Sequence, residues 1–130
     1  MSGSSVGGHR SQSAVSRSAA ARRLGVLGEQ IAVAWYLNHG YRVLERNWRC
    51  SFGELDLVCA TTSEIVICEV KTRRANSFGT PAEAVTREKQ NRLRRLAGVW
   101  LSDHDEHRDQ IRFDVVSIVG LEVTVLKSAF

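Results

Sequence analysis

The chain has 130 residues, of which 43% are hydrophobic and 25% charged, and its formal net charge at pH 7 is +4. This is ordinary globular usage, and it is enough for one compact domain with a single core. No stretch reaches the ~18 apolar residues that a membrane span requires. The composition therefore excludes a membrane-spanning protein, and we expect no membrane partner.

The first residues differ in composition from the rest of the chain. Residues 1–22 are rich in Ser, Gly and Ala, carry several arginines and lack the continuous apolar segment of a secretory signal. This composition predicts a disordered basic tail over residues 1–22, followed by a single α/β domain over residues 23–130.

A first helix is predicted from about Ala20 to Asn38. Gly25 and Gly28 would let it approach another backbone closely, at some cost in helix propensity. Glu29 has apolar neighbours on its own side, so we expect it to point toward a sheet; a solvated surface glutamate is the alternative. The apolar residues that form the predicted core stripe of this helix are Leu24, Leu27, Ile31 and Trp35.

The order of the predicted elements is helix, three strands, helix and two strands, which is typical of an α/β layer with helices covering a sheet. Asp114 lies near the start of the fourth strand and is interpreted as the structural partner of a basic residue. The predicted strands are Tyr41 to about Arg49, Glu54 to Ala60, Glu64 to Arg73, Gln110 to Val119 and Glu122 to Lys127.

Two of these strands carry acidic residues at positions that can meet. Asp56 is polar in an otherwise apolar strand. If this strand and the next form an antiparallel hairpin centred between Thr62 and Ser63, residues whose numbers sum to 125 face each other, and Asp56 lies opposite Glu69. Opposed carboxylates destabilise a sheet unless a cation neutralises them. The pattern therefore predicts a neutralising cation, either Lys71 on the Glu69 face or a divalent ion.

A second helix is predicted from the segment Thr80-Pro81-Ala82-Glu83, which matches a capping box with proline at the first helical position, to about Leu101. Basic residues gather here: from Lys71 to Arg95, eight basic side chains against two acidic ones give the segment a charge of +6. Such a zone suits the phosphate backbone of DNA or RNA, and a solvated helix face is the alternative. The predicted nucleic-acid-binding residues are Arg73, Arg74, Arg87, Lys89, Arg92 and Arg95.

The cysteines do not indicate a metal site. Cys50, Cys59 and Cys68 are odd in number and form no Cys-x-x-Cys pair, and the four histidines are scattered. Structural zinc sites usually bring their ligands in tight pairs. We therefore expect free thiols in a cytoplasmic protein, and no zinc.

The motifs together resemble those of a known family. Gly53-Glu54-Leu55-Asp56-Leu57, Glu69-Val70-Lys71-Thr72-Arg73 and Arg112-Phe113-Asp114-Val115, with Gly28-Glu29 in the first helix, are similar to the YraN-type family of small bacterial proteins. The similarity extends from Leu24 to about Ile118. That family resembles the PD-(D/E)xK nuclease superfamily and is close in layout to archaeal Holliday-junction resolvases. Leu55 stands where the superfamily motif has its proline.

The resemblance implies a restriction-endonuclease-like mixed β-sheet flanked by helices, with a centre that depends on Mg²⁺ or Mn²⁺. Carboxylate and carbonyl oxygens are the hard ligands that Mg²⁺ prefers. Glu54 is expected to support this centre or to pair with an arginine. The implied catalytic residues are Asp56, Glu69 and Lys71, and the implied metal ligands are Glu29, Asp56, Glu69 and the backbone carbonyl of Val70.

Three functions remain open at this point. The first is a metal-dependent endonuclease that hydrolyses phosphodiester bonds in DNA, with branched or structured DNA expected by analogy alone. The second is a nucleic-acid-binding module that keeps the nuclease fold without turnover, and the third is a protein-interaction subunit whose acids and arginines form buried ion pairs. The sequence leaves open whether the chain forms a homodimer, binds RNA, or binds one metal ion or two.

Overall fold

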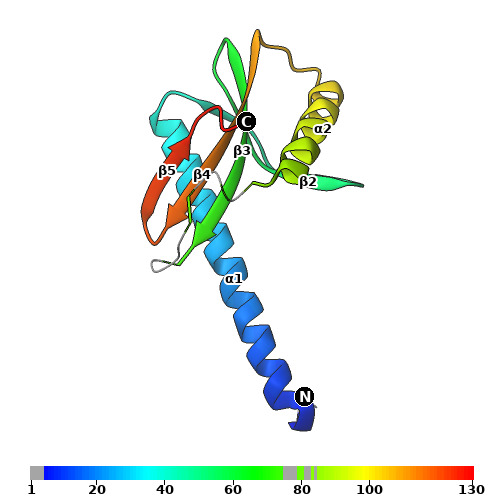
Figure 1. The fold of residues 1–130 in the computed structure, drawn as a ribbon, viewed down its shortest axis with the longest axis vertical. Coiled ribbons are helices and arrows are strands. Elements are labelled where there is room, and N and C mark those ends of the chain that lie inside the picture. The colour runs from blue at the N-terminus through cyan, green and yellow to red at the C-terminus, as the bar shows by residue number, and fades with distance from the viewer. Residues whose placement is uncertain (1–4, 75–78, 81–82, 84) are drawn as a thin grey trace.

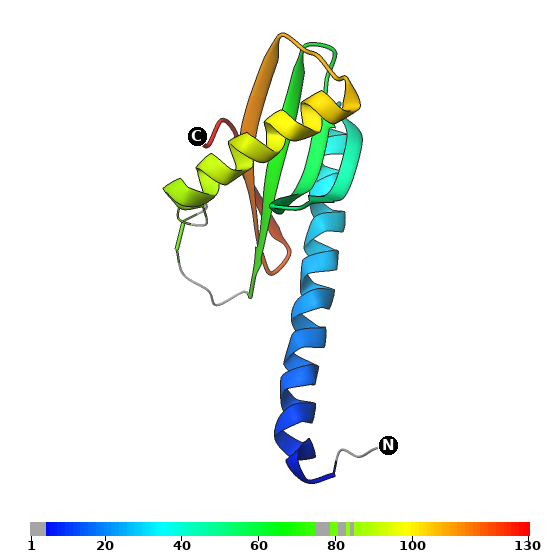
Figure 2. The same cartoon turned by 90° about the vertical axis from the view of Figure 1, so that its right-hand side faces the viewer.

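Apolar, β-branched segments build a five-stranded sheet, and one helix packs on each of its faces (Figures 1 and 2). This mixed sheet flanked by helices is an α/β, restriction-endonuclease-like arrangement, so the predicted fold class is confirmed. The computed structural model describes residues 5–74, 79–80, 83 and 85–130, and it describes side chains from residue 19 onward.

The strands lie in the sheet in chain order. β3 and β4 are parallel, and the other neighbouring strands are antiparallel. Parallel neighbours need a crossover connection, which contains α2. The elements are α1 (Ser5–Asn38), β1 (Arg42–Cys50), β2 (Gly53–Ala60), β3 (Glu64–Arg73), α2 (Arg87–His104), β4 (Gln110–Val119) and β5 (Glu122–Leu126), and each predicted strand agrees with the observed one to within a residue.

The sheet separates two apolar clusters, because successive side chains of a strand point to opposite faces. On one face, Leu93, Leu96 and Trp100 of α2 pack against strand residues such as Ile65 and Ile67. On the other face, Ala32 and Tyr36 of α1 pack against a second set of strand residues. The three cysteines are free, as expected from the sequence.

The buried face of α1 differs from the predicted one. Gly28, Ala32 and Tyr36 are buried, whereas Leu27 of the predicted stripe is 45% exposed. The reason is the close approach that a glycine permits: a Cβ at Gly28 would overlap the side chain of Thr72 in β3. Gly25 has no atom within 4 Å of such a Cβ, so the expectation of close approach is confirmed at Gly28 and wrong at Gly25.

Helix α1 begins well before the predicted start. It includes residues 5–22, a segment whose composition predicts a disordered basic tail, and residues 1–4 lie outside the described part of the chain. Adding residues to an existing helix needs no new nucleation, and an alanine-containing segment without proline can continue one. The first part of α1 extends away from the sheet in both views (Figures 1 and 2). None of the described helices is long and apolar enough to cross a membrane.

Helix α2 begins later than predicted. It starts at Arg87, and the Oγ of Thr86 accepts a hydrogen bond from the backbone N–H of Lys89 at 3.2 Å, which is an N-terminal cap. The predicted cap at Thr80 is wrong: the carbonyl of Thr80 instead accepts from the N–H of Glu83 at 3.1 Å in a separate turn. Pro81 and Ala82 of the predicted capping box lie outside the described residues.

A buried charge network joins β4 to its surroundings. Asp114 is fully buried, and Arg112 donates to both of its oxygens, at 2.8 and 2.9 Å. Tyr36 of α1 donates to the same carboxylate at 2.7 Å, and Arg112 also donates to Glu64 at 2.9 Å. The predicted pairing of Asp114 with a basic residue is confirmed.

We expect Asp114→Ala to destabilise the chain by about 3–5 kcal/mol, because it leaves the Arg112 guanidinium partly buried without its main partner. Urea unfolding of the two proteins measures this difference. Asp103→Ala, at an exposed position of α2, is the control and should change the stability little. A loss below about 1 kcal/mol in Asp114→Ala would contradict the proposed structural importance of the network.

Candidate functional site

The hairpin of β2 and β3 has the predicted register. Leu57 pairs with Cys68 and Val58 pairs with Ile67, so the paired numbers sum to 125. The turn is closed by a hydrogen bond of 3.0 Å from the N–H of Thr61 to the carbonyl of Glu64. Asp56 and Glu69 are the next residues along the two strands, and they therefore adjoin at the end of this ladder of paired residues.

Asp56 is held between an attractive and a repulsive neighbour. The backbone N–H of Val70 donates to its Oδ2 at 2.9 Å, which favours the ionised carboxylate. Burial disfavours that charge more strongly, and the Glu69 carboxylate repels it, so the pKa of Asp56 is raised to about 7. The described side chains therefore leave this carboxyl under-compensated, as expected of a position that suits a cation.

Glu69 is neutralised by a lysine that the motif did not identify. Its side chain is buried, and its Oε2 forms an ion pair with Nζ of Lys89 in the first turn of α2. Lys71, the predicted partner, is exposed on the strand two residues further on. Helix capping explains the difference, because Thr86 begins the helix at a point that brings Lys89 onto Glu69.

A cavity of about 260 Å³ opens beside Asp56. Val70 and Lys71 line it from β3, and Glu29 lines it from α1. Glu29 accepts a hydrogen bond from Nδ2 of Asn47 at 3.1 Å, a contact that the sequence analysis did not foresee. The cavity thus brings together the predicted site residues Glu29, Asp56, Val70 and Lys71, while the contact of Glu69 is with α2.

The carboxylates do not form a complete cage of their own. Within the described part of the chain, no three side chains of His, Cys, Asp or Glu are grouped so that they could hold a metal ion. The close pair is Asp56 and Glu69, and Glu29 reaches the same cavity as Asp56. Mg²⁺ characteristically uses one or two carboxylates and keeps several waters, so the observed oxygen donors still fit that ion.

Glu54 pairs with an arginine, which was one of the two expectations for it. Its Oε2 lies 2.9 Å from Nε of Arg49 on the neighbouring strand, and both side chains are half exposed or more. An exposed pair of this kind contributes little to stability.

The predicted nucleic-acid-binding residues fall into different settings. Arg74 and Arg87 are exposed, whereas Lys89 is engaged with Glu69. Arg92 and Arg95 line a second cavity, together with Phe52 from the turn between β1 and β2. Arg73 approaches Gly79, where its Nη1 lies 2.9 Å from the position of a Cβ.

Residues 28–118 match the model of the Uncharacterised protein family UPF0102. The chain belongs to this family. It is 51% identical over 96 residues to a UPF0102 protein of Beutenbergia cavernae, which covers 74% of this chain and 81% of the relative. It is 50% identical over 96 residues to a UPF0102 protein of Nocardia farcinica, which covers 74% of this chain and 76% of that relative. It is 53% identical over 97 residues to one of Mycolicibacterium gilvum, which covers 73% of this chain and 79% of that relative. The matched region contains Asp56, Glu69 and Lys71, and a YraN-type, uncharacterised family is thereby confirmed.

The raised pKa of Asp56 predicts a pH-dependent stability. Because the folded pKa of about 7 lies above the ordinary value near 4, the folded state favours the protonated acid. This stabilising contribution is complete below about pH 4 and is lost as the pH rises through 7. In a chelator-containing buffer, wild type should therefore lose a few kcal/mol relative to Asp56→Asn between pH 4 and pH 8, since one pKa unit corresponds to about 1.4 kcal/mol.

Urea unfolding at a series of pH values, compared between wild type and Asp56→Asn, tests this expectation. Asp103→Asn, which removes an exposed carboxylate of α2, is the matched control and should follow wild type. Parallel stability curves for wild type and Asp56→Asn would show that the Asp56 carboxylate is already compensated in the folded chain.

Proposed function

We propose that this chain is a Mg²⁺- or Mn²⁺-dependent endonuclease that hydrolyses phosphodiester bonds in DNA. The observation that carries the proposal is the adjoining pair Asp56 and Glu69, in which burial and mutual repulsion raise the pKa of Asp56 to about 7. Uncompensated charge of this kind costs stability, so its presence is better explained by a cation that the site binds.

The donor set supports a hard divalent ion. Asp56, Glu69 and the backbone carbonyl of Val70 would hold it, and Glu29 borders the same cavity. When bound, such an ion supplies Lewis-acid polarisation of a phosphate and a bound water of lowered pKa. Carboxylate and carbonyl oxygens favour Mg²⁺ or Mn²⁺ over softer metals.

Lys71 supplies positive charge at the same cavity. Its exposed ammonium lies on the wall that Asp56 and Val70 also line. In the proposed reaction Lys71 balances the charge that develops on the phosphoryl oxygens, or it orients the attacking water. Neither role requires Lys71 to break an ion pair with Glu69, because Glu69 pairs with Lys89. The ion pair that Lys89 makes with Glu69 supports this separation of roles.

The proposed nucleic-acid partner is inferred from the positions of the arginines. Arg74 and Arg87 are exposed, and Arg92 and Arg95 line a cavity on the helix that also contacts Glu69 through Lys89. Such contacts attract and position a polyanion without reading its sequence. Branched or structured DNA is the proposed substrate by analogy with the fold, and a homodimer would match the two strands that such a substrate presents.

Purified protein incubated with labelled four-way junction, flap, duplex and single-stranded DNA in Mg²⁺ or Mn²⁺ should cut at least one of these ligands. Asp56→Asn and Lys71→Ala should lower the rate by at least about 100-fold while they keep DNA binding, because each removes a group at the proposed reacting centre. Lys127→Ala, another exposed lysine, is the control and should leave the rate unchanged. Equal cutting by wild type and both site variants would identify a contaminating nuclease instead.

A second candidate function is a nucleic-acid-binding module without turnover. The observation that favours it is the Lys89–Glu69 ion pair, which already places a cation on one of the two carboxylates. In that case DNA binding should weaken steeply with added salt, and no cutting should follow in any divalent ion. Absence of salt-dependent binding would leave the protein-interaction subunit.

Lys89→Gln separates the two candidates. If Asp56 and Glu69 bind a divalent ion, removal of the competing ammonium should tighten Mn²⁺ binding by about tenfold or more, measured by calorimetry at fixed pH. Arg87→Gln, which removes an exposed cation from the same helix turn, is the matched control and should change the affinity little. Unchanged or weaker Mn²⁺ binding in Lys89→Gln would argue that the pair is a structural ion-pair site.

A further inference from the structure

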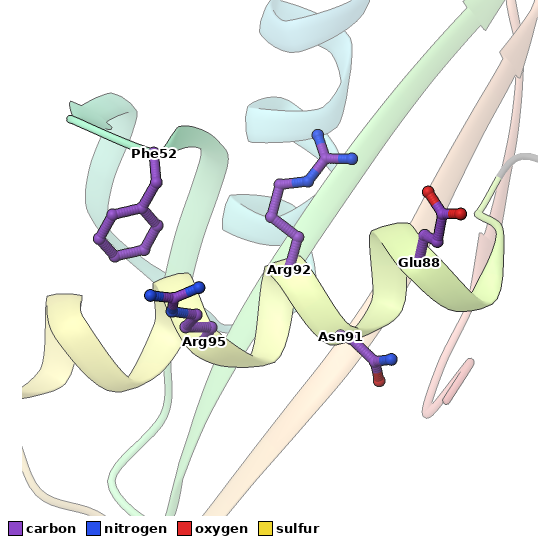
Figure 3. Close-up of a pocket in the computed structure, with 5 residues that line it drawn as sticks. All are labelled: Phe52, Glu88, Asn91, Arg92 and Arg95. Carbon is purple, nitrogen blue, oxygen red and sulfur yellow. The ribbon is translucent and has the colours of Figure 1, made fainter.

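A cavity of about 480 Å³ lies apart from the carboxylate pair, between the turn that follows β1 and the exposed side of α2. Phe52 lines it from the turn, and Glu88, Asn91, Arg92 and Arg95 line it from the helix. Figure 3 shows the Phe52 ring above α2, with Arg95 beneath the ring and Arg92 directed to the same side of the helix as Phe52, whereas Asn91 points away from it.

Phe52 is the aromatic residue in a cavity wall whose other lining residues are polar or charged. Phe52 is 37% exposed, and the guanidinium of Arg95 lies over its ring at 4.7 Å from the centroid. The Arg95 cation thus covers one face of a ring that stays partly exposed. Aromatic rings and arginine planes are the two surfaces on which unstacked nucleobases commonly stack.

The turn is built so that the ring reaches the helix. Gly53 has φ +150°, and a Cβ there would lie 3.0 Å from Leu96 Cδ1 and 3.6 Å from Arg92 Cδ. Glycine suits this position, because a side chain rarely adopts this φ and its Cβ would crowd Leu96. The position of Phe52 beside Arg92 and Arg95 thus follows from a close backbone approach that the fold enforces.

The charges suit a base better than a bare phosphate. Arg92 and Arg95 are accompanied in the cavity wall by the carboxylate of Glu88, which repels an anion and can accept from an exocyclic amino group. Glu88, Arg92 and Arg95 follow one another at helical spacings of four and three residues, so they share one face of α2.

The cavity also lies close to the carboxylate pair. Lys89, which holds Glu69, precedes Arg92 by three residues, or ~4.5 Å along the helix axis. Phe52, in the turn before β2, precedes Asp56 by four residues, which span at most ~13 Å. The Phe52 cavity and the carboxylate pair therefore lie within the length of a few nucleotides of each other.

From these observations we infer that the Phe52–Arg95 surface stacks an unpaired nucleobase of the substrate strand. The inference deepens the proposed function and rests on it: the substrate class becomes nucleic acid with an unpaired arm next to a duplex, because a base inside a duplex is already stacked on both faces. Arg92 contacts the phosphate that follows the stacked base.

Fluorescence anisotropy in a chelator-containing buffer, which prevents cutting, tests the inference with the full chain. The three labelled ligands have equal length and phosphate number: a fork with unpaired arms, a fully paired duplex, and the same fork with abasic sites in its arms. Phe52→Leu and Arg95→Lys remove the flat surfaces and keep size or charge. Arg94→Lys is the matched control, because the Arg94 guanidinium lies over Phe113 and Phe130 instead.

Both test variants should bind the fork about 5- to 100-fold more weakly, which corresponds to the loss of one stacked base, and the duplex less than twofold more weakly. Wild type should bind the abasic fork more weakly than the intact fork by the same factor. The variants should show no further loss of affinity when the arms are abasic. Arg94→Lys should bind all three ligands as wild type does. Thermal unfolding of each variant confirms that it is folded.

Two failures are distinguishable. Wild type that binds and cuts nucleic acid, with fork binding unchanged by Phe52→Leu and by abasic arms, would overturn the stacking site and leave the proposed function standing. A loss of duplex affinity in the variants as large as their loss of fork affinity would have the same meaning. If wild type binds none of the three ligands at low salt, the proposed function fails, and the stacking site fails with it.

Discussion

The repulsion between two adjoining carboxylates is the constraint on which this site depends. Asp56 and Glu69 lie side by side because the β2–β3 register places them there, and the chain offsets the cost with the Val70 amide on one acid and the Lys89 ammonium on the other. Neither contact removes the strain completely, since the pKa of Asp56 stays raised. The fold therefore tolerates an electrostatic cost at one point of an otherwise apolar sheet, as functional sites commonly do.

The two helices approach this point in different ways. Helix α1 comes close through Gly28, whose missing side chain makes room for Thr72, and so brings Glu29 to the cavity beside Asp56. Helix α2 comes close through Lys89 and through the contact of Leu96 with Gly53. Both contacts lie where β2 begins and β3 nears its end, so both helices border the charged groups there.

The sequence predicted the strands and the hairpin register well, because alternation in β2 and β3 and the length of the turn leave one pairing that buries the apolar residues. It predicted the start of α2 wrongly, since Thr80-Pro81-Ala82-Glu83 and Thr86 are both plausible caps and only packing selects between them. The missed ion pair of Lys89 followed from that error. Phe52 was missed for a different reason: a single aromatic residue in a turn has no periodicity, and its role depends on how closely Gly53 lies to α2.

The Lys89 ammonium has a consequence for how the chain comes to be folded. Many metal sites cannot form before the ion arrives, because their assembled acids would repel one another. Here the first turn of a helix brings its own counter-charge to Glu69, so the helix can dock on the sheet without leaving that buried acid unpaired. Assembly of the sheet and the helix therefore does not depend on an ion at this acid, because the chain supplies the counter-charge of Glu69 itself.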